Sequence, residues 1–458
     1  MKAKSLICCI FLCFHIVFVG ESQDNLTPRG YLTTPIELNE IKQKADNGLQ
    51  PYHNAVQDVL RQAKTEWDFR LSTQENCEDA DSPAWLDNSG GIPIIYAKAL
   101  SYHLEGKEQY AQEVLAILEQ IMTEVQTFSL EQQRCRLVLS WGTPELIASA
   151  DLIEGYWHNK VCTGPQSFII HDTIIAEGNC KDLFQNWLAK NVYYVVSLTG
   201  EDSQSNWGAA ATNAMAYTAD YLWDREDIVL INRVPPLINE GQSYQLSPAE
   251  AYAHANMIAL DRMNGYRVEY GSSSSCDYLA GTQQQNTRTP VKSQITPEGI
   301  IAEDARRTQY CNISEYNGRY QNYPQIHINN NVQQCELMLR RGDSSCYDNV
   351  DMQEIPDFAF VDPNGNEQTT HLYPGRGSIE QAINAVIVTS NTEWRHDAGL
   401  EVSYRYYFTH HRSDNVVFWY QEIGHENNCS QGICFATLTH GFAPGETPAL
   451  PPIVAPPS

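Results

Sequence analysis

One stretch, from Ser205 to Leu222, constrains the fold of this chain more than any other. It holds six alanines between positions 209 and 219, and alanine combines high helix propensity with almost no side-chain bulk. We expect a slim helix that other helices approach closely, as in the inner ring of a helical barrel. Ser205 or Asn206 can cap its first turn, which places Asn206 and Trp207 at the positive end of the helix dipole. A buried core helix with an ordinary cap is the alternative.

Helical patterns also dominate the chain on either side of this stretch. Several segments repeat apolar residues at three- and four-residue spacing, and Gly or Pro marks many of their ends. The expected helices are Pro35–Asn47, Pro51–Trp67, Ile92–Glu105, Lys107–Phe128, Pro144–Trp157, Lys181–Leu198, Asn206–Leu222 and Ser247–Met263. Strand-like alternation is scarce before Phe358–Val361 and Val416–Tyr420. The pattern predicts a mainly α fold of paired helices packed in a ring, with a smaller irregular or β-containing C-terminal part.

The first 20 residues have the features of a secretory signal peptide. Lys2 and Lys4 precede a mostly apolar run at positions 6–19, which ends at the small residue Gly20. No later segment reaches the roughly 18 apolar residues that a membrane span needs. We therefore expect a soluble, secreted protein with one domain at residues 21–442, interrupted by irregular segments at 271–297 and 347–377. A Pro-rich tail at residues 443–458 is expected to lie extended, outside the core.

Ten of the 13 cysteines follow the predicted signal peptide. An even number in an exported chain favours five disulfides over a catalytic thiol. Short separations favour the pairs Cys429–Cys434, Cys335–Cys346 and Cys162–Cys180, and these leave Cys77–Cys135 and Cys276–Cys311. Sequons at Asn25, Asn312 and Asn428 indicate a glycoprotein. No cysteine or histidine spacing typical of zinc is present, so we expect no metal and no cofactor.

The net charge of −26 argues against nucleic acid and anionic membranes as partners. It also repels an acidic polysaccharide, but salt screens such a bulk field, and the Debye length falls to about 3 Å at 1 M. A local group of arginines can then still bind a carboxylate. Global charge therefore does not decide the substrate, and we expect a monomer.

Four blocks of the sequence resemble the alginate-lyase superfamily, most closely polysaccharide lyase family thirty-eight and more distantly family five. They are Asp81–Tyr102 with Gly106–Ala111, Asn206-Trp207 with the alanine helix and Asp224-Arg225, Arg319–Gln325 with Cys335-Glu336 and Arg341–Asp343, and Glu401–Tyr407. This resemblance implies an α/α-toroid, an incomplete helical barrel. It also implies β-elimination on a uronic-acid polymer such as alginate or glucuronan.

The chemistry of β-elimination sets requirements that can be compared with these blocks. The C6 carboxylate must be neutralised, a base must remove the C5 proton, and an acid must protonate the leaving O4. Amide and guanidinium donors stabilise the charge that develops on the carboxylate. Tyrosine, with a free pKa near ~10, acts as the base near neutral pH only if cations lower that pKa. Arg319 beside Tyr323 meets this requirement.

The catalytic assignment has alternatives. Residues 303–310 resemble the family-five pattern of Glu-x-x-Arg followed by tyrosine, so Tyr310 with Arg306 competes with the preferred Tyr323 and Arg319. Pro324 favours Tyr323, because it places that tyrosine at the entrance of a helix.

The carboxylate-neutralising donor and the base are assigned from the same blocks. Asn206 is the expected donor. Some relatives have a histidine base at the position of Trp207, and tryptophan cannot accept a proton. The histidines that could replace it are His254 and His327. His254 is included among the catalytic candidates.

The remaining candidates are substrate contacts. They are Trp207, which can stack on a sugar ring, Arg307, His327 and Tyr404.

Two other functions fit the same fold. An inverting glycoside hydrolase needs two carboxylates roughly 6.5–9.5 Å apart. The candidates for such a pair are Asp81, Asp87, Glu303 and Asp304. A wall-bound or carbohydrate-binding glycoprotein without turnover is the non-enzymatic alternative, and the missing histidine at Trp207 favours it.

Overall fold

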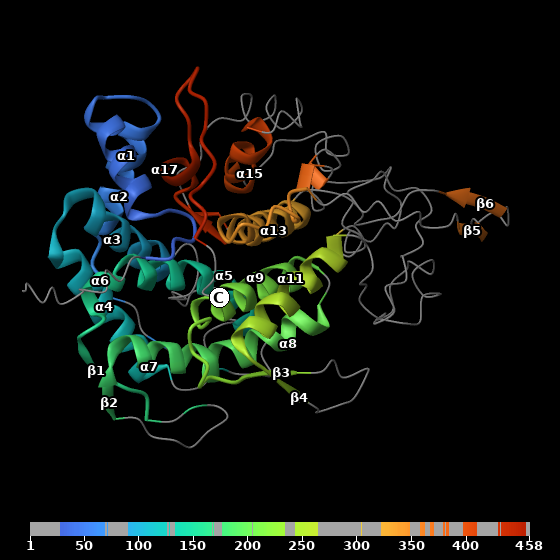
Figure 1. Cartoon of the computed structure of the whole chain (residues 1–458), viewed down its shortest axis with the longest axis horizontal. Coiled ribbons are helices and arrows are strands. Elements are labelled where there is room, and N and C mark those ends of the chain that lie inside the picture. The colour runs from blue at the N-terminus through green and yellow to red at the C-terminus, as the bar shows by residue number, and fades with distance from the viewer. Residues whose placement is uncertain are drawn as a thin grey trace, which may run out of the picture.

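The computed structural model describes residues 28–68, 71, 90–125, 128, 133–166, 168, 176–203, 205–233, 243–263, 304, 322–348, 358–361, 367–370, 379–380, 382–383, 397–409, 429–430 and 432–454. This part of the chain is mainly helical, as predicted (Figure 1). The expected signal peptide and the expected strand Val416–Tyr420 lie outside it. None of its helices is long and apolar enough to cross a membrane.

The helices follow the predicted order. They are α1 (Pro35–Asp46), α2 (Tyr52–Ala63), α3 (Gly91–Glu105), α4 (Glu108–Glu124), α5 (Gln133–Leu152), α6 (Glu154–Trp157), α7 (Cys180–Trp187), η1 (Leu188–Tyr193), α8 (Tyr194–Asp202), α9 (Asn206–Tyr221), α11 (Pro248–Met263), α13 (Asn322–Arg340), α15 (Asp397–Thr409) and α17 (Ala436–His440). The predicted helix Lys181–Leu198 is three consecutive segments, because the π-helical turn η1 separates α7 from α8.

The predicted start of one helix, at Pro144, is wrong. The helix α5 begins at Gln133 and continues through Pro144. A proline inside a helix costs about 3 kcal/mol, because its ring clashes with the preceding turn and it donates no hydrogen bond. Burial of Leu139, Leu146 and Ile147 on both sides of the proline offsets this cost.

The strands form four separate two-stranded antiparallel pairs. They are β1 (Val161–Thr163) with β2 (Glu177–Asn179), β3 (Leu230–Arg233) with β4 (Ser243–Leu246), β5 (Phe358–Val361) with β6 (Glu367–Thr370), and β7 (Cys429–Ser430) with β8 (Ile433–Cys434). The predicted strand Phe358–Val361 is confirmed as β5. The pairs before it were not predicted, because strands this short carry only a weak alternation signal and their pairing is tertiary.

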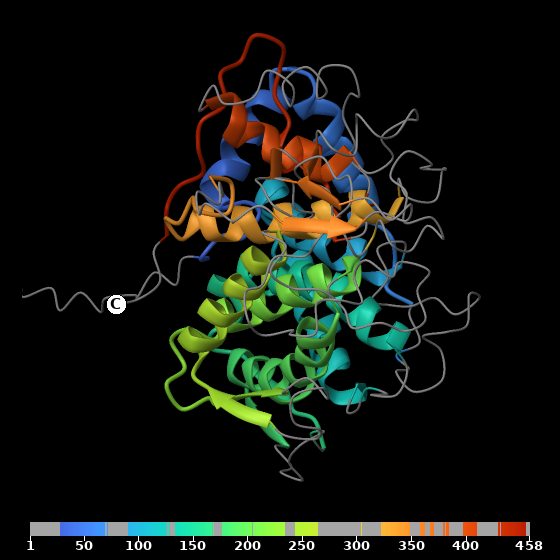
Figure 2. The same ribbon diagram turned by 90° about the vertical axis from the view of Figure 1, so that its right-hand side faces the viewer.

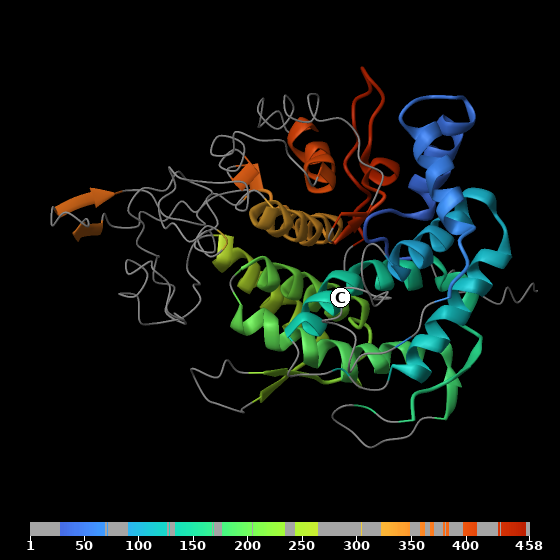
Figure 3. The ribbon, with the colours of Figure 1, turned by 180° about the vertical axis from the view of Figure 1, so that it is seen from behind.

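The helices α5, α9 and α13 lie side by side and run in the same direction. One buried cluster joins Leu137 and Trp141, in the first half of α5, with Ala210 and Ile326, near the N-terminal ends of α9 and α13. Near their C-terminal ends, Arg341 donates two hydrogen bonds of 2.8 Å to the carboxylate of Asp220. Figures 1 and 3 show α13 between α9 on one side and α15 on the other. Three N-terminal ends therefore meet at one end of the molecule.

Two more helices share this direction. His103 of α3 bonds the carbonyl oxygen of Leu152, at the C-terminal end of α5, at 2.7 Å. In α15, the backbone N–H of Gly399 donates to Asn329 Oδ1 of α13 at 3.0 Å. Arg405, further along α15, and Arg340, at the end of α13, both bind the carboxylate of Glu37.

The helix α11 runs the opposite way against α9. Its last turn contacts the beginning of α9, where Arg262 donates to Thr212 Oγ1 at 3.1 Å. Its first turn contacts the region after α9, where Tyr252 packs edge-on against Trp223. Figure 2 shows the β3–β4 pair on the opposite side of the helices from α15. The helix α11 also reaches α13, because Gln334 donates to Asn256 Oδ1 at 2.8 Å.

The alanine helix has the predicted character. Every residue of α9 except Trp207 is buried, and Ser205 is its N-cap. Close packing surrounds it: a Cβ atom added at Gly208 would lie 1.8 Å from the Ser203 carbonyl oxygen, and one added at Gly200 would lie 2.4 Å from Met215 Sδ. Gly208 requires glycine because backbone atoms occupy the space of a side chain, whereas a side chain at position 200 would have to displace the methionine side chain.

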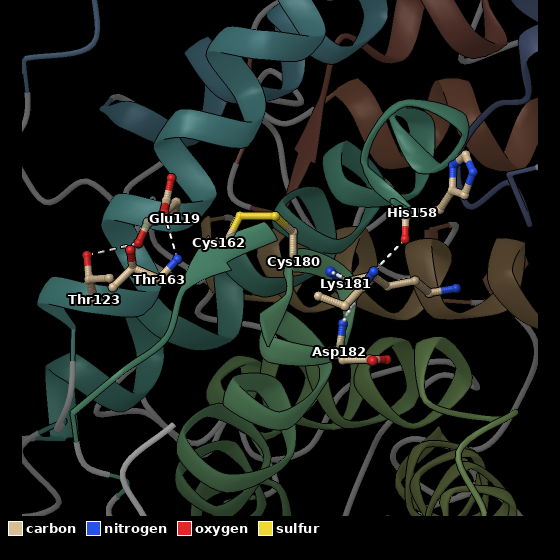
Figure 4. Close-up of a disulfide and its surroundings, with 9 residues drawn as sticks. Glu119, Thr123, His158, Cys162, Thr163, Cys180, Lys181 and Asp182 are labelled. Carbon is tan, nitrogen blue, oxygen red and sulfur yellow. Dashed lines mark hydrogen bonds between the residues drawn. A yellow bond between two sulfur atoms is a disulfide. The ribbon is translucent and has the colours of Figure 1, made fainter. Parts of the chain in front are cut away.

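Three predicted disulfides are confirmed: Cys162–Cys180, Cys335–Cys346 and Cys429–Cys434. The first ties β1 to the start of α7, beside a hydrogen bond of 2.7 Å from the Thr163 backbone N–H to Glu119 (Figure 4). Cys135 is also disulfide-bonded, but its expected partner Cys77 lies outside the described residues. The expected pair Cys276–Cys311 lies outside them as well.

The C-terminal segment is extended, as expected, but it packs against the helices. Ala443 is 7% exposed and belongs to the core. Val454 donates its backbone N–H to the Arg340 carbonyl oxygen at 2.8 Å, and Tyr52 of α2 donates to Glu446 at 2.5 Å. The expectation that residue 443 and its neighbours lie outside the core is wrong, because they cover the ends of α1, α13 and α15.

Candidate functional site

The candidate site lies where the N-terminal ends of α5, α9 and α13 meet. Asn206 is the first residue of α9, and Tyr323 is the second residue of α13, directly before Pro324 as predicted. The structure places their two helices side by side. It therefore brings the two preferred blocks of the sequence to one end of the helix bundle.

Asp304 joins the beginnings of these two helices. Its Oδ1 accepts a hydrogen bond from the Asn206 backbone N–H at 3.1 Å, and its Oδ2 accepts one from His327 Nδ1 at 2.7 Å. The side chains of Asp304 and His327 are 0% and 1% exposed. In the sequence, Asp304 was a candidate only for the hydrolase, since no spacing connects it with positions 206 and 327.

The carboxylate of Asp304 also determines the hydrogen-bonding state of His327. An imidazole that donates from Nδ1 to a carboxylate carries, when neutral, its lone pair on Nε2. The negative charge of Asp304 beside the first turn of α9 is stabilised by the positive end of that helix dipole. This pair is a fixed, buried polar unit beneath the two helix ends.

An aromatic and apolar surface lies beside this polar unit. The buried cluster of Leu137, Trp141, Ala210 and Ile326 supports Trp207 and Tyr323, which are both only partly buried. Trp207 is the one residue of α9 that is not buried. A partly exposed indole and a partly exposed phenol on the same apolar cluster provide aromatic surface and a hydroxyl, which suit a sugar ring.

The loop before α9 is held in place by a buried arginine. Arg262 Nη2 donates to the Ser203 carbonyl oxygen at 3.3 Å, while Nη1 donates to Thr212 Oγ1. The guanidinium thus ties the end of α11 to both sides of the α9 N-terminus. This arrangement fixes the position of Asn206.

Below the site, the helix α13 carries an unusual set of buried amides. They are Gln325, Asn329, Asn330, Asn331, Gln333 and Gln334, each at most 3% exposed. Gln333 donates to Glu145 Oε1 of α5 at 2.8 Å and accepts from Asn213 Nδ2 of α9 at 2.6 Å. Burial raises the pKa of Glu145 to about 8. This network was not predicted from the sequence, although its signal is the consecutive amides at positions 329–331 and 333–334 inside a helix.

His254 lies in a different hydrogen-bonded group. Its Nε2 contacts the Tyr244 hydroxyl of β4 at 2.6 Å and also the carboxylate of Glu201 at the end of α8. Asn232 of β3 donates to the same Glu201 oxygen at 2.6 Å and accepts from the Tyr193 hydroxyl at 3.0 Å. These contacts connect His254 with the β3–β4 pair.

The other predicted site residues are placed as follows. Tyr404 is 6% exposed and packs against Phe408 and Phe442, at centroid distances of 5.3 and 5.9 Å. Burial raises the pKa of Tyr404. Arg319, Arg306, Arg307 and Tyr310 lie outside the described residues, as do Asp81, Asp87 and Glu303 of the hydrolase alternative.

The described residues contain no group of three or more His, Cys, Asp or Glu side chains that could hold a metal ion. No protein-family model matches the chain, and no curated protein matches it significantly. The resemblance to the alginate-lyase superfamily therefore rests on the sequence blocks quoted above.

Proposed function

We propose that this chain is a secreted polysaccharide lyase that cleaves a uronic-acid polymer, such as alginate or glucuronan, by β-elimination. The observation that carries the proposal is the junction of Asn206, Asp304 and His327, with Trp207 and Tyr323 next to it. The blocks that resemble the lyases at positions 206 and 323 are far apart in sequence, and the fold brings their helices together.

The proposed architecture is an α/α-toroid. Its inner ring would consist of α3, α5, α9, α13 and α15, which run in the same direction, with oppositely running helices such as α11 outside. Residues 433–435 support closure of the ring, because Phe435 packs against Tyr96 of α3 at a centroid distance of 6.1 Å. In such a ring, the N-terminal ends of the inner helices share one rim, where Asn206 and Tyr323 lie.

Exposure decides which residue touches the sugar. Tyr323 is partly exposed, whereas His327, one helical turn further, is 1% exposed. Tyr323 is therefore the proposed acid and base, and His327 with Asp304 positions the start of α13 against α9. The tyrosinate takes the C5 proton, the C5–H electron pair forms the C4=C5 double bond, and the C4–O4 bond breaks. The same hydroxyl then protonates O4, so the residue returns to its starting state.

The remaining residues stabilise charge and hold the ring. Asn206 is 1% exposed, like His327, so by the same criterion its side chain helps to fix the start of α9. The positive end of the α9 dipole is the proposed stabiliser of the C6 carboxylate. Arg319 is the proposed cation that favours the tyrosinate. Trp207 is proposed to stack on a sugar ring beside the cleaved bond.

One observation argues against the hydrolase alternative. Asp304 is fully buried, and both of its carboxylate oxygens already accept hydrogen bonds from Asn206 and His327. A general acid or base must instead reach the glycosidic oxygen or a water molecule. Asp304 thus has a structural position rather than that of a hydrolytic carboxylate.

The test is incubation of the purified protein with alginate, polymannuronate, polyguluronate and glucuronan, monitored by ultraviolet absorbance of the unsaturated product. We expect absorbance to rise with at least one polymer. Tyr323→Phe should lower that rate by a factor of about 10²–10⁴, while Tyr156→Phe, at a partly exposed tyrosine on α6, should match the parent. New reducing ends without absorbance would instead indicate a hydrolase, and polymer binding without either product would indicate a binding protein.

A further inference from the structure

A groove of about 710 Å³ lies on the outer helices, away from the ends of α9 and α13. Residues 63–67 after α2 form one wall, Lys98 of α3 contributes to the floor, and α4 forms the other wall from Lys107 to Gln120. None of the candidate site residues lines it. The groove is therefore a separate feature of the surface.

A tryptophan is held at one end of this groove. The Trp67 indole Nε1–H donates to Gln120 Oε1 of α4 at 3.0 Å, and the residue is only partly buried. The indole lines the groove and packs partly against the hydrophobic core, and the hydrogen bond restricts its rotation. A rigid aromatic ring of this kind binds a sugar ring at a low cost in conformational entropy.

A buried ammonium group lies in the floor. The Lys98 side chain is 5% exposed, and its Nζ donates to the Ala63 carbonyl oxygen at 2.8 Å and to Glu113. Glu113 also accepts from Gln109 at 2.8 Å. These bonds fix the carboxylate of Glu113 and the amide of Gln109 in the groove lining, where ligand hydroxyl groups can form hydrogen bonds with them.

The charge of the groove differs from that of the whole chain. Three lysines and two glutamates line it, whereas the chain has a net charge of −26. Lys98 and Lys107 are already paired with Glu113 and Glu105. Within the described part of the chain, the exposed Lys64 forms no ion pair, although its charge also acts on Glu105. Lys64 is therefore the cation of the groove that can bind the carboxylate of a ligand.

The groove is also long enough for more than one sugar. It follows α4 and its N-cap over 14 residues, from position 107 to position 120, which corresponds to about 20 Å at 1.5 Å per residue. A chain of several linked rings fits this length better than a single small molecule.

We propose that this groove is a second, non-catalytic binding site for the uronate polymer, with one sugar ring on Trp67 and one carboxylate on Lys64. This inference rests on the proposed function, because the polymer is the same. Its role would be to hold the long substrate on the protein while the candidate site acts on another part of it.

The experiment measures binding without turnover. In the Tyr323→Phe background, affinity electrophoresis in gels that contain alginate compares the protein with added Trp67→Ala, Lys64→Glu or Trp223→Ala. We expect Trp67→Ala and Lys64→Glu each to weaken binding about tenfold or more, a change of 1.4 kcal/mol or more. Trp223→Ala, at a partly buried tryptophan that packs on α11, should bind as the background does. Lys64→Glu changes only an exposed side chain, so it tests the site even if Trp67→Ala fails to fold.

Unchanged alginate binding in folded Lys64→Glu would overturn the proposal, as would an equal loss of binding to a neutral glucan in the same assay. Failure of the proposed function looks different. If the parent protein forms no unsaturated product but Lys64→Glu still weakens alginate binding, the second site stands and the lyase activity does not.

Discussion

His327 Nδ1 lies 2.7 Å from Asp304 Oδ2, and the other oxygen of the same carboxylate binds the backbone of Asn206. This single side chain thus connects the second turn of α13 with the first turn of α9. Because the carboxylate, the imidazole and the Asn206 side chain are almost fully buried, their geometry is shielded from water. A change at Asp304 should therefore alter the relative positions of the groups proposed to act on the sugar.

Asp304→Asn tests this connection. The amide has only one acceptor oxygen, so it cannot accept from both Asn206 and His327. We expect kcat to fall by a factor of about 10–100, because small displacements of reacting groups have effects of this size, while KM changes less. Asp227→Asn, at an exposed carboxylate paired with Arg225, is the control and should retain the parent rate. An unchanged kcat in folded Asp304→Asn would contradict the positioning role.

Trp207→Ala tests the proposed sugar surface at the start of α9. Removal of the indole should raise KM by about tenfold or more, while Trp207→Phe should retain most of the affinity because it keeps an aromatic ring. Steady-state kinetics on the responsive polymer separates the two parameters. If Trp207→Ala changes neither KM nor kcat, the indole packs within the protein only.

The helices and short disulfides could be predicted because their signals are local. Alanine content and a serine cap predicted α9, Pro324 predicted the entrance of α13, and short cysteine separations predicted three bridges. The start of α5 could not be predicted in this way. Its proline is a helix breaker by itself, and only the tertiary burial of the residues around it makes a continuous helix favourable.

The connections within the candidate site could not be predicted because they are tertiary. Nothing at positions 206, 304 and 327 indicates that one carboxylate joins the other two residues. The amides of α13 suggest a solvent-exposed helix, yet they are buried against Glu145 and Asn213. Polar groups become favourable in the interior only when partners from other helices satisfy them, and a single segment does not reveal those partners.

Arg341→Met tests the buried ion pair at the opposite end of the bundle. The substitution leaves the carboxylate of Asp220 buried beside Arg29 alone, and breaking such a pair costs about 3–5 kcal/mol of unfolding free energy. Urea denaturation should show this loss, whereas Arg61→Met, in an exposed pair with Asp58, should change stability by less than about 1 kcal/mol. The double variant Asp220→Asn with Arg341→Met should recover part of the loss. If Arg341→Met loses no more unfolding free energy than Arg61→Met, the ion pair of Arg341 and Asp220 contributes little to stability.

Glu145→Gln tests the polar network inside the bundle through its pH dependence. Burial raises the pKa of Glu145 from 4.5 to about 8, so the folded chain keeps a proton that the unfolded chain releases. Unfolding free energy therefore decreases as pH rises from about 5 to about 8, by about 1.4 kcal/mol per pH unit. Glutamine is neutral and can still accept from Gln333, so the variant should lose this decrease and exceed the parent in stability near pH 8. Thermal and urea unfolding between pH 5 and 9 measures the difference, and Glu226→Gln, at an exposed loop position, should follow the parent curve. Parallel curves for Glu145→Gln and the parent would mean that the carboxyl is ionised in the folded protein.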